Sequence, residues 1–262
     1  MGSSPEEGNR ELPNILLIVV DDMNWDSVSC YGKSMFPNST PNIDKLAEEG
    51  IRFDKAHVTV AVCQPSRQVL MTGKYPQHIG AEGFTPISED VTTLGEILSA
   101  NGYYNAIFCK EHHLAPEYKY AWDEVRRTND MAHGRSPQLF YQSAQEVMRS
   151  AQKKGKPFFL MANIEDPHRP FHGSRGDAQL YGPGAKGQNQ NMRDQFSMPS
   201  RIYTQEEIEE LPPWFPKGGN SNNLGKIKED LAQYLSSVRR ADDSMGALMK
   251  ALVYDGVETL GF

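Results

Sequence analysis

Four short segments of the sequence carry acidic, basic or thiol side chains at spacings that could support chemistry. They are Asp21 with Asp22, Cys63 with Arg67, Lys110 with His112 and His113, and Asp166 with His168 and Arg169. Carboxylates hold hard cations such as Ca²⁺ or Mg²⁺, and clustered cationic side chains hold oxyanions. A cysteine at a helix start lies near free N–H groups that favour negative charge. Together the four segments predict a site for a tetrahedral oxyanion.

Each segment also has a purely structural explanation. Paired aspartates often begin a loop, and a free cysteine is usually a small buried apolar group. A Lys-x-His-His run suits a solvated strand end, and Asp-Pro-His-Arg-Pro suits a turn shaped by proline. The site interpretation therefore depends on the elements that precede the segments and on whether these elements bring them to one place.

Short apolar runs and helix-capping residues predict alternating strands and helices. Strands are expected at 14–20, 51–58, 103–109 and 156–164. Helices are expected at 41–49 after the N-cap Thr40, at 65–73, within 92–102 with Thr92 or Thr93 as cap, at 136–154 and at 226–252. This order predicts an α/β fold with a mostly parallel sheet sandwiched by helices, in which ligands lie at the carboxyl ends of the strands.

Composition limits the kinds of partner. A net charge of -7 and a pI near 5.5 argue against a nucleic-acid surface, so an anionic ligand needs a local basic cluster. The cysteines Cys30, Cys63 and Cys109 are odd in number and widely spaced, which argues against a disulfide framework.

The remaining segments carry no membrane or export signal. The longest apolar run, 15–20, is far shorter than the roughly 20 residues of a membrane helix. The polar leader 1–13 has no secretory pattern. No membrane partner is expected, and the cellular location stays open, compatible with export to a periplasm, the extracellular space or a lysosome. The irregular stretch 173–226, rich in Gly, Asn, Gln and Pro, is typical of active-site walls.

The stretch CQPSRQVLMTG, 63–73, resembles the signature of the formylglycine-dependent sulfatases, Cys-x-Pro-Ser-Arg followed by Thr-Gly. The strand ending in two aspartates, the helix after Thr40, CKEHHLAP and DPHRPF resemble further segments of that family. DPHR and the late run DLAQYLSSVRRADDSMGALMKAL are most similar to the N-sulfoglucosamine sulfohydrolases, the heparan sulfamidases. The resemblance implies an alkaline phosphatase-like fold and removal of sulfate, as ester or sulfamate, from a sulfated sugar or glycosaminoglycan fragment.

The resemblance also implies the cofactors. Asp21 and Asp22 would be ligands of Ca²⁺, or of Mg²⁺. Cys63 would be converted by a formylglycine-generating maturation enzyme, and its hydrated aldehyde would be both a metal ligand and the nucleophile.

The basic residues take the remaining roles that the resemblance implies. Arg67 would hold the hydrate, and Lys110 would contact the sulfuryl oxygens. One histidine would steer the second hydroxyl of the hydrate: Lys-x-His spacing selects His112, whereas the following Leu-Ala-Pro selects His113, which we favour. His168 would bind sulfate or protonate the leaving group. Further substrate contacts would come from Arg169 and from whichever of the paired histidines does not steer the hydrate.

The resemblance covers the N-terminal part of the family's catalytic domain, here 14–262. The family takes its remaining metal ligands, an Asp-Asn pair, from the strand that follows the last helix. We therefore expect a domain truncated before that strand, with weak metal binding and little turnover by itself. The alternatives are an incomplete fragment or pseudoenzyme that binds sulfated glycan and, less favoured, a phosphoesterase of the same superfamily, because those enzymes use threonine or serine as nucleophile.

Overall fold

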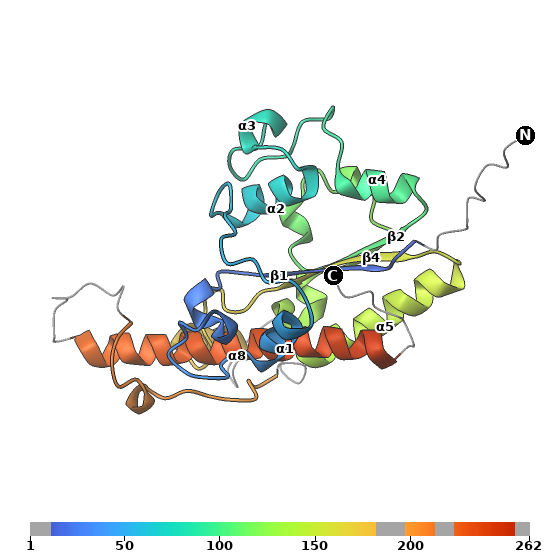
Figure 1. Ribbon diagram of the computed structural model, residues 1–262. Coiled ribbons are helices and arrows are strands. Elements are labelled where there is room, and N and C mark those ends of the chain that lie inside the picture. Colours follow the sequence, from blue (N-terminus) through green and yellow to red (C-terminus); the bar gives the residue numbers. More distant parts are fainter. Residues whose placement is uncertain (1–11, 182–196, 213–222, 255–262) are drawn as a thin grey trace, which may run out of the picture.

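The computed structural model describes residues 12–181, 197–212 and 223–254 (Figure 1). In this part of the chain, four parallel strands form one sheet in the order β1-β4-β2-β3. The strands are β1 (Ile15–Val20), β2 (Tyr104–Phe108), β3 (Glu124–Arg126) and β4 (Phe158–Ile164). The predicted α/β class with a parallel sheet is confirmed.

Strand β4 lies at the centre of the sheet. All seven of its residues are buried, as expected for an apolar run without alternation that is covered on both faces. It pairs with β1 from Ile15↔Phe159 to Val20↔Ile164, and with β2 on its other side. Because the strands are parallel, the residues that follow β1, β2 and β4 meet at one edge.

Helices cover both faces of the sheet (Figure 1). On one face lie α2 (Cys63–Thr72), α3 (Pro76–Ile79) and α4 (Leu94–Ala100); on the other lie α1 (Pro41–Glu49), α5 (Pro137–Lys153) and the long α8 (Leu224–Tyr254). One apolar core joins the sheet to α5 and α8, and a second joins it to the side of α2 and α4. This is the sandwich that the sequence predicts.

Short elements complete the chain. They are the 3₁₀ turns η1 (Trp25–Ser27), η2 (Ser29–Tyr31), η3 (Glu111–His113), η4 (Glu117–Tyr120), η5 (Thr128–Gly134) and η7 (Gln205–Glu207), and the helix α6 (Arg175–Tyr181). Part of the predicted irregular stretch 173–226 therefore contains regular elements; 182–196 and 213–222 lie outside the described residues, as do 1–11 of the predicted leader.

Capping residues set several helix starts. Thr93 accepts a hydrogen bond from the Glu96 N–H, and the Glu96 side chain accepts one from Thr93, so Thr93 rather than Thr92 caps α4. Ser136 caps α5, which then begins with proline. Helix α2 ends at Gly73, whose φ of 67° lies in the left-handed region. It begins at Cys63 and not at Pro65, so the cysteine belongs to its first turn.

The prediction of a strand at 51–58 is wrong. This segment forms turns and extended backbone outside the sheet, and Ile51, Phe53 and Val58 are about 70% exposed, at 71%, 72% and 69%. Its alternating apolar residues suit a strand, but alternation does not reveal whether a partner strand exists. None of the helices in the described ranges is both long and apolar enough to cross a membrane.

Candidate functional site at the carboxyl edge of the sheet

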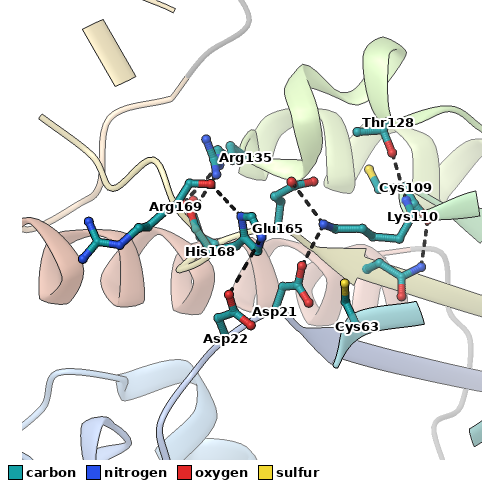
Figure 2. Close-up of polar contacts among 12 residues, drawn as sticks. Asp21, Asp22, Cys63, Cys109, Lys110, Thr128, Arg135, Glu165, His168 and Arg169 are labelled. Carbon is teal, nitrogen blue, oxygen red and sulfur yellow. Dashed lines mark hydrogen bonds and ion pairs between the residues drawn. The ribbon is translucent and has the colours of Figure 1, made fainter. Parts of the chain in front are cut away.

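The parallel sheet brings three of the predicted segments to one edge. Asp21 follows β1 and its N–H donates to the carbonyl of Ile164, the last residue of β4. Cys109 directly follows β2 and Lys110 comes next, while Glu165 directly follows β4. Figure 2 shows Asp21, Lys110 and Glu165 pointing toward one another.

Lys110 is the centre of this group. Its Nζ lies 2.7 Å from Asp21 Oδ2 and 3.2 Å from Glu165 Oε1, and the residue is 4% exposed. Burial alone lowers the pKa of a lysine, but Glu165 and Asp21 outweigh it and raise the pKa of Lys110 above its ordinary value. The ammonium therefore stays charged in a desolvated site.

The backbone aims Lys110 inward at a conformational cost. Cys109 and Lys110 have φ values of 57° and 52°, in the left-handed region that non-glycine residues rarely adopt. The Lys110 N–H donates to Thr128 Oγ1 at 2.9 Å, and Thr128 in turn donates to Glu111. This buried chain of hydrogen bonds fixes the turn after β2.

Arg67 links the start of α2 to the same edge. Its Nη1 lies 3.2 Å from Asp21 Oδ1 and 3.4 Å from the Cys63 carbonyl oxygen, and its Nε donates to Asn163 Oδ1 at 3.2 Å. Burial raises the pKa of Asp21, but Arg67 and Lys110 outweigh it and hold that pKa below its ordinary value. Through Arg67, the half-buried Cys63 is placed beside Asp21 (Figure 2).

The two adjacent histidines differ in exposure. His113 is 7% exposed, whereas the His112 side chain is 57% exposed. Burial, with further effects from His112, Lys110 and Arg67, lowers the pKa of His113 to about 3. The buried His113 imidazole is therefore held in its neutral form. The assignment of a chemical role to either ring stays a prediction.

The depressed pKa of His113 predicts a pH-dependent stability. Above the ordinary histidine pKa of 6.5, His113 is neutral in both the folded and the unfolded chain, and its contribution to the unfolding free energy is fully present. As the pH falls from 6.5 toward about 3, the unfolded chain binds the proton and the folded chain does not, so this contribution to stability is lost. Between about pH 7 and pH 4, we expect the wild-type protein to lose about 1–3 kcal/mol more unfolding free energy than a His113→Gln variant. Urea unfolding at each pH measures this. A His57→Gln variant, which removes an exposed histidine elsewhere, serves as control and should follow the wild type; equal pH profiles for all three proteins would contradict the prediction.

His168 and Asp22 lie at the margin of the site. His168 Nε2 is 3.9 Å from Asp22 Oδ2, and the two side chains are 37% and 65% exposed. His168 Nδ1 lies 2.6 Å from the carbonyl oxygen of Arg169. The imidazole thus has one nitrogen toward the backbone and the other toward Asp22 (Figure 2).

The Arg169 guanidinium points away from these groups (Figure 2). It forms two hydrogen bonds to the Asp230 carboxylate, of 2.9 and 2.6 Å, and stacks over Phe171 at 4.1 Å. The structure therefore does not bring Arg169 to Lys110 and Cys63, so the expectation that it contacts substrate there finds no support.

Asp166 belongs to a buried ion-pair network and does not reach the surface of the site. It is fully buried and forms hydrogen bonds of 2.6 and 3.0 Å with Arg240 of α8, while Arg135 Nε lies at 3.4 Å. Arg135 also donates to the His168 carbonyl oxygen at 2.8 Å. Sequence reasoning missed Arg135 and Arg240: Arg135 lies in no recognisable motif, and nothing in the run 230–252, which contains Arg240, indicates that this arginine pairs with Asp166.

Glu165 and Asn163 were also missed. Both belong to the β4 segment, and Asn163 is a fully buried polar residue inside a strand, a pattern that requires hydrogen-bond partners. Asn163 accepts from Arg67 and donates to the carbonyls of Phe108 and Cys109 at 2.9 Å. An amide and an acid at the end of an apolar strand were therefore the available signals.

The described residues fit a hard dication only in part. Calcium takes six to eight oxygen ligands. The Asp21 oxygens face Arg67 and Lys110, and Asp22 is mostly exposed. Within the described ranges, no group of three or more His, Cys, Asp or Glu side chains is arranged to hold a metal ion. A complete calcium site is therefore not formed by these side chains.

The charged side chains of the site hold one another in fixed positions. Two buried cations, Lys110 and Arg67, face a helix start that carries a thiol, and two carboxylates, Asp21 and Glu165, balance them. Cations held in a dry, rigid setting stabilise developing negative charge without rearranging.

Curated relatives match parts of the chain. The N-acetylglucosamine-6-O-sulfatase of Bacteroides thetaiotaomicron is 26% identical over 185 residues, which cover 64% of this chain and 33% of the relative. Human arylsulfatase A is 38% identical over 109 residues, which cover 38% of this chain and 21% of the relative. The chain thus spans a third or less of the length of these two proteins.

Solved structures share the fold. A protein in complex with its substrate D-glucosamine-2-N,6-O-disulfate aligns with a TM-score of 0.64 and 21% identity, over 94% of this chain and 63% of its own. A protein of the alkaline phosphatase superfamily from Vibrio parahaemolyticus aligns with a TM-score of 0.58 and 16% identity, over 93% and 51%. At these identities the likeness concerns the fold, which is of the predicted alkaline phosphatase-like type. A family model described as Sulfatase matches residues 13–258, and the chain therefore belongs to the sulfatase family.

Proposed function

We propose that the protein hydrolyses a sulfuric ester or sulfamate of a sulfated carbohydrate, with Cys63 as the formylglycine precursor. The observation that carries the proposal is the placement of Cys63 in the first turn of α2, tied by Arg67 to Asp21 and through Asp21 to Lys110. Here the thiol stands for the residue that the maturation enzyme would oxidise. The formylglycine hydrate would supply the nucleophilic hydroxyl for sulfur, with departure of the sugar oxygen or nitrogen, and a second hydroxyl through which sulfate would be released and the aldehyde restored.

The basic residues of the chain have distinct tasks in this proposal. Arg67 orients the residue at position 63, because it contacts the carbonyl oxygen of that residue at 3.4 Å. Lys110 stabilises the charge that develops on the sulfuryl oxygens. The neutral His113 orients the second hydroxyl of the hydrate, and the half-exposed His168 can donate a proton to the leaving oxygen or nitrogen. Asp21 and Asp22 stay our predicted calcium ligands, and no step here depends on metal.

The substrate class follows from what the relatives are named for. Proteins similar to this chain are described as acting on N-acetylglucosamine 6-O-sulfate, or were solved with D-glucosamine-2-N,6-O-disulfate. A sulfated amino sugar within a glycosaminoglycan fragment is therefore the substrate that we propose. Whether the O-sulfate or the N-sulfate is removed is decided by an assay with each singly sulfated sugar.

We expect Cys63 to be converted to formylglycine when the chain is produced together with a formylglycine-generating enzyme. The reason is that Pro65 and Arg67 follow it at the spacing of the family signature. Mass spectrometry of the peptide that contains position 63 detects the aldehyde, and the peptides with Cys30 and Cys109 serve as internal controls that keep their thiols. Only unmodified thiol at position 63 would count against the proposal.

Turnover of an aryl sulfate by the converted protein tests the activity itself. Release of sulfate supports the proposed hydrolase. Conversion at position 63 with binding of sulfated sugar, but without sulfate release, would instead favour the glycan-binding alternative. Release of phosphate from an aryl phosphate in preference to sulfate would favour the phosphoesterase.

A further inference from the structure

A two-part groove lies beside the candidate site, along α8. One cavity of about 660 Å³ and a second of about 690 Å³ share Asn24, Leu231 and Tyr234 as borders. The Tyr234 hydroxyl accepts hydrogen bonds from the Asn24 N–H at 3.0 Å and from Ser27 Oγ at 3.1 Å. This contact fastens η1 to α8 and separates the two cavities.

The groove lies close to the candidate site along the chain. Asn24, which borders both cavities, lies two residues beyond Asp22. Arg169, which borders the second cavity, directly follows His168. The groove therefore neighbours Asp22 and His168 at the margin of the candidate site, and a ligand longer than one sugar is needed to reach from one to the other.

Trp25 gives the first cavity an aromatic surface. This residue is 61% exposed, although burial of so large an aromatic side chain stabilises most folds. Its ring meets Tyr31 edge to face, with centroids 6.1 Å apart and an interplanar angle of 85°. That contact holds the indole in place and leaves it open to solvent, as a platform for a ligand ring.

Among the charged residues of the groove, Arg169 and Asp230 pair with each other, whereas Asp26 forms no ion pair within the described ranges. Asp26 borders the first cavity and is partly exposed, and its carboxylate accepts hydrogen bonds of the kind that sugar hydroxyl groups donate. Lys33 borders the first cavity and Lys226 the second, and neither forms an ion pair with any residue in the described ranges. Two such lysines favour a ligand that carries sulfate or carboxylate groups.

We propose that this groove binds the sugar adjacent to the sulfated residue in an anionic glycan, with Trp25 stacked against its ring. A sugar ring combines an apolar face for the indole, hydroxyl groups for Asp26 and anionic substituents for the lysines. An apolar peptide side chain would satisfy only the indole. The inference rests on the proposed function, because it requires a sulfated sugar in the adjoining site.

Binding measurements with two probes test the inference without requiring turnover. The probes are D-glucosamine-2-N,6-O-disulfate and a disaccharide in which the same sugar is joined to a uronate. By calorimetry, the disaccharide should bind about tenfold or more tightly than the monosaccharide. Trp25→Ala should remove this preference, and Tyr118→Ala, which truncates an aromatic residue that is 67% exposed and lies outside the groove, should keep it.

Tryptophan fluorescence gives a second readout. The chain has three tryptophans, Trp25, Trp122 and Trp214. The disaccharide should change the emission of the wild-type protein and leave that of a Trp25→Phe variant unchanged, while calorimetry shows that this variant still binds. An undiminished disaccharide preference in Trp25→Ala, or an emission change that persists in Trp25→Phe, would overturn the inference and leave the proposed function intact. Failure of the wild-type protein to bind either sugar would overturn both.

Discussion

Replacing Arg240 with methionine is expected to lower the free energy of unfolding by about 3–5 kcal/mol. The Arg240 and Asp166 side chains are both fully buried, and their hydrogen bonds of 2.6 and 3.0 Å offset the cost of taking two charges out of water. Without Arg240, the Asp166 carboxylate keeps only the longer contact of 3.4 Å to Arg135. A buried charge with a weakened partner accounts for most of the loss.

The neighbouring Arg239 provides the matched control. Its side chain is 19% exposed and pairs with Asp243 at 3.3 Å, one turn along the same helix. Arg239→Met should cost no more than about 1 kcal/mol, the usual range for ion pairs near the surface. Urea unfolding of the three proteins gives the comparison. If the two variants lose the same unfolding free energy, the buried ion pair of Arg240 and Asp166 contributes no more to stability than the pair nearer the surface.

Replacing Lys110 with methionine is expected to reduce turnover of an aryl sulfate by roughly 10²–10³-fold. This prediction depends on the proposed hydrolase activity and is expressed as a ratio to the small turnover expected of this part of the catalytic domain. The ammonium is 4% exposed, stays charged and is fixed between Asp21 and Glu165, so its charge is preorganised for an oxyanion. Methionine has a similar length and no charge, and the two carboxylates that remain would repel a sulfate group.

Lys119→Met is the control for this variant. Lys119 is also mostly buried, with a side chain 12% exposed, and pairs with Glu96 at 2.8 Å, away from the candidate site. Steady-state kinetics should show nearly wild-type turnover for it. Circular dichroism must first show that Lys110→Met is folded at the assay temperature, because loss of the ammonium also leaves Asp21 and Glu165 less compensated. Folded Lys110→Met with wild-type turnover would exclude the assigned role.

Much of the fold could be predicted from local patterns, because burial on both faces leaves a plain signature. Continuous apolar runs marked β1, β2 and β4, and capping residues marked α1, α4 and α5. Strand β3, of three residues with two charges, has no such signature and exists only because β2 pairs with it. The strand predicted at 51–58 failed for the opposite reason, since its pattern was present and its partner was not.

The site was predictable where residue type and strand ends coincide, as for Asp21 and Lys110. Their proximity follows from a parallel sheet alone. The exact partners did not follow. Glu165 also pairs with Lys110, and Arg135 and Arg240 pair with Asp166, because contacts between residues 31 to 74 positions apart depend on how whole helices pack. The pairing of Arg169 with Asp230 on α8 could not be predicted for the same reason.

The paired left-handed residues at the end of β2 bear on any attempt to engineer the protein. Left-handed backbone costs roughly 1 kcal/mol or more at each non-glycine residue. At Cys109 and Lys110 the fold is therefore less stable than it would be with ordinary backbone, and in return the Lys110 side chain is directed into the site. Glycine at position 109 would relieve part of that strain and would also loosen the turn that presents the ammonium. A search for stabilising variants that ranks substitutions by backbone strain alone would select this change, although Cys109 is fully buried and loss of its side chain would leave a cavity in the core.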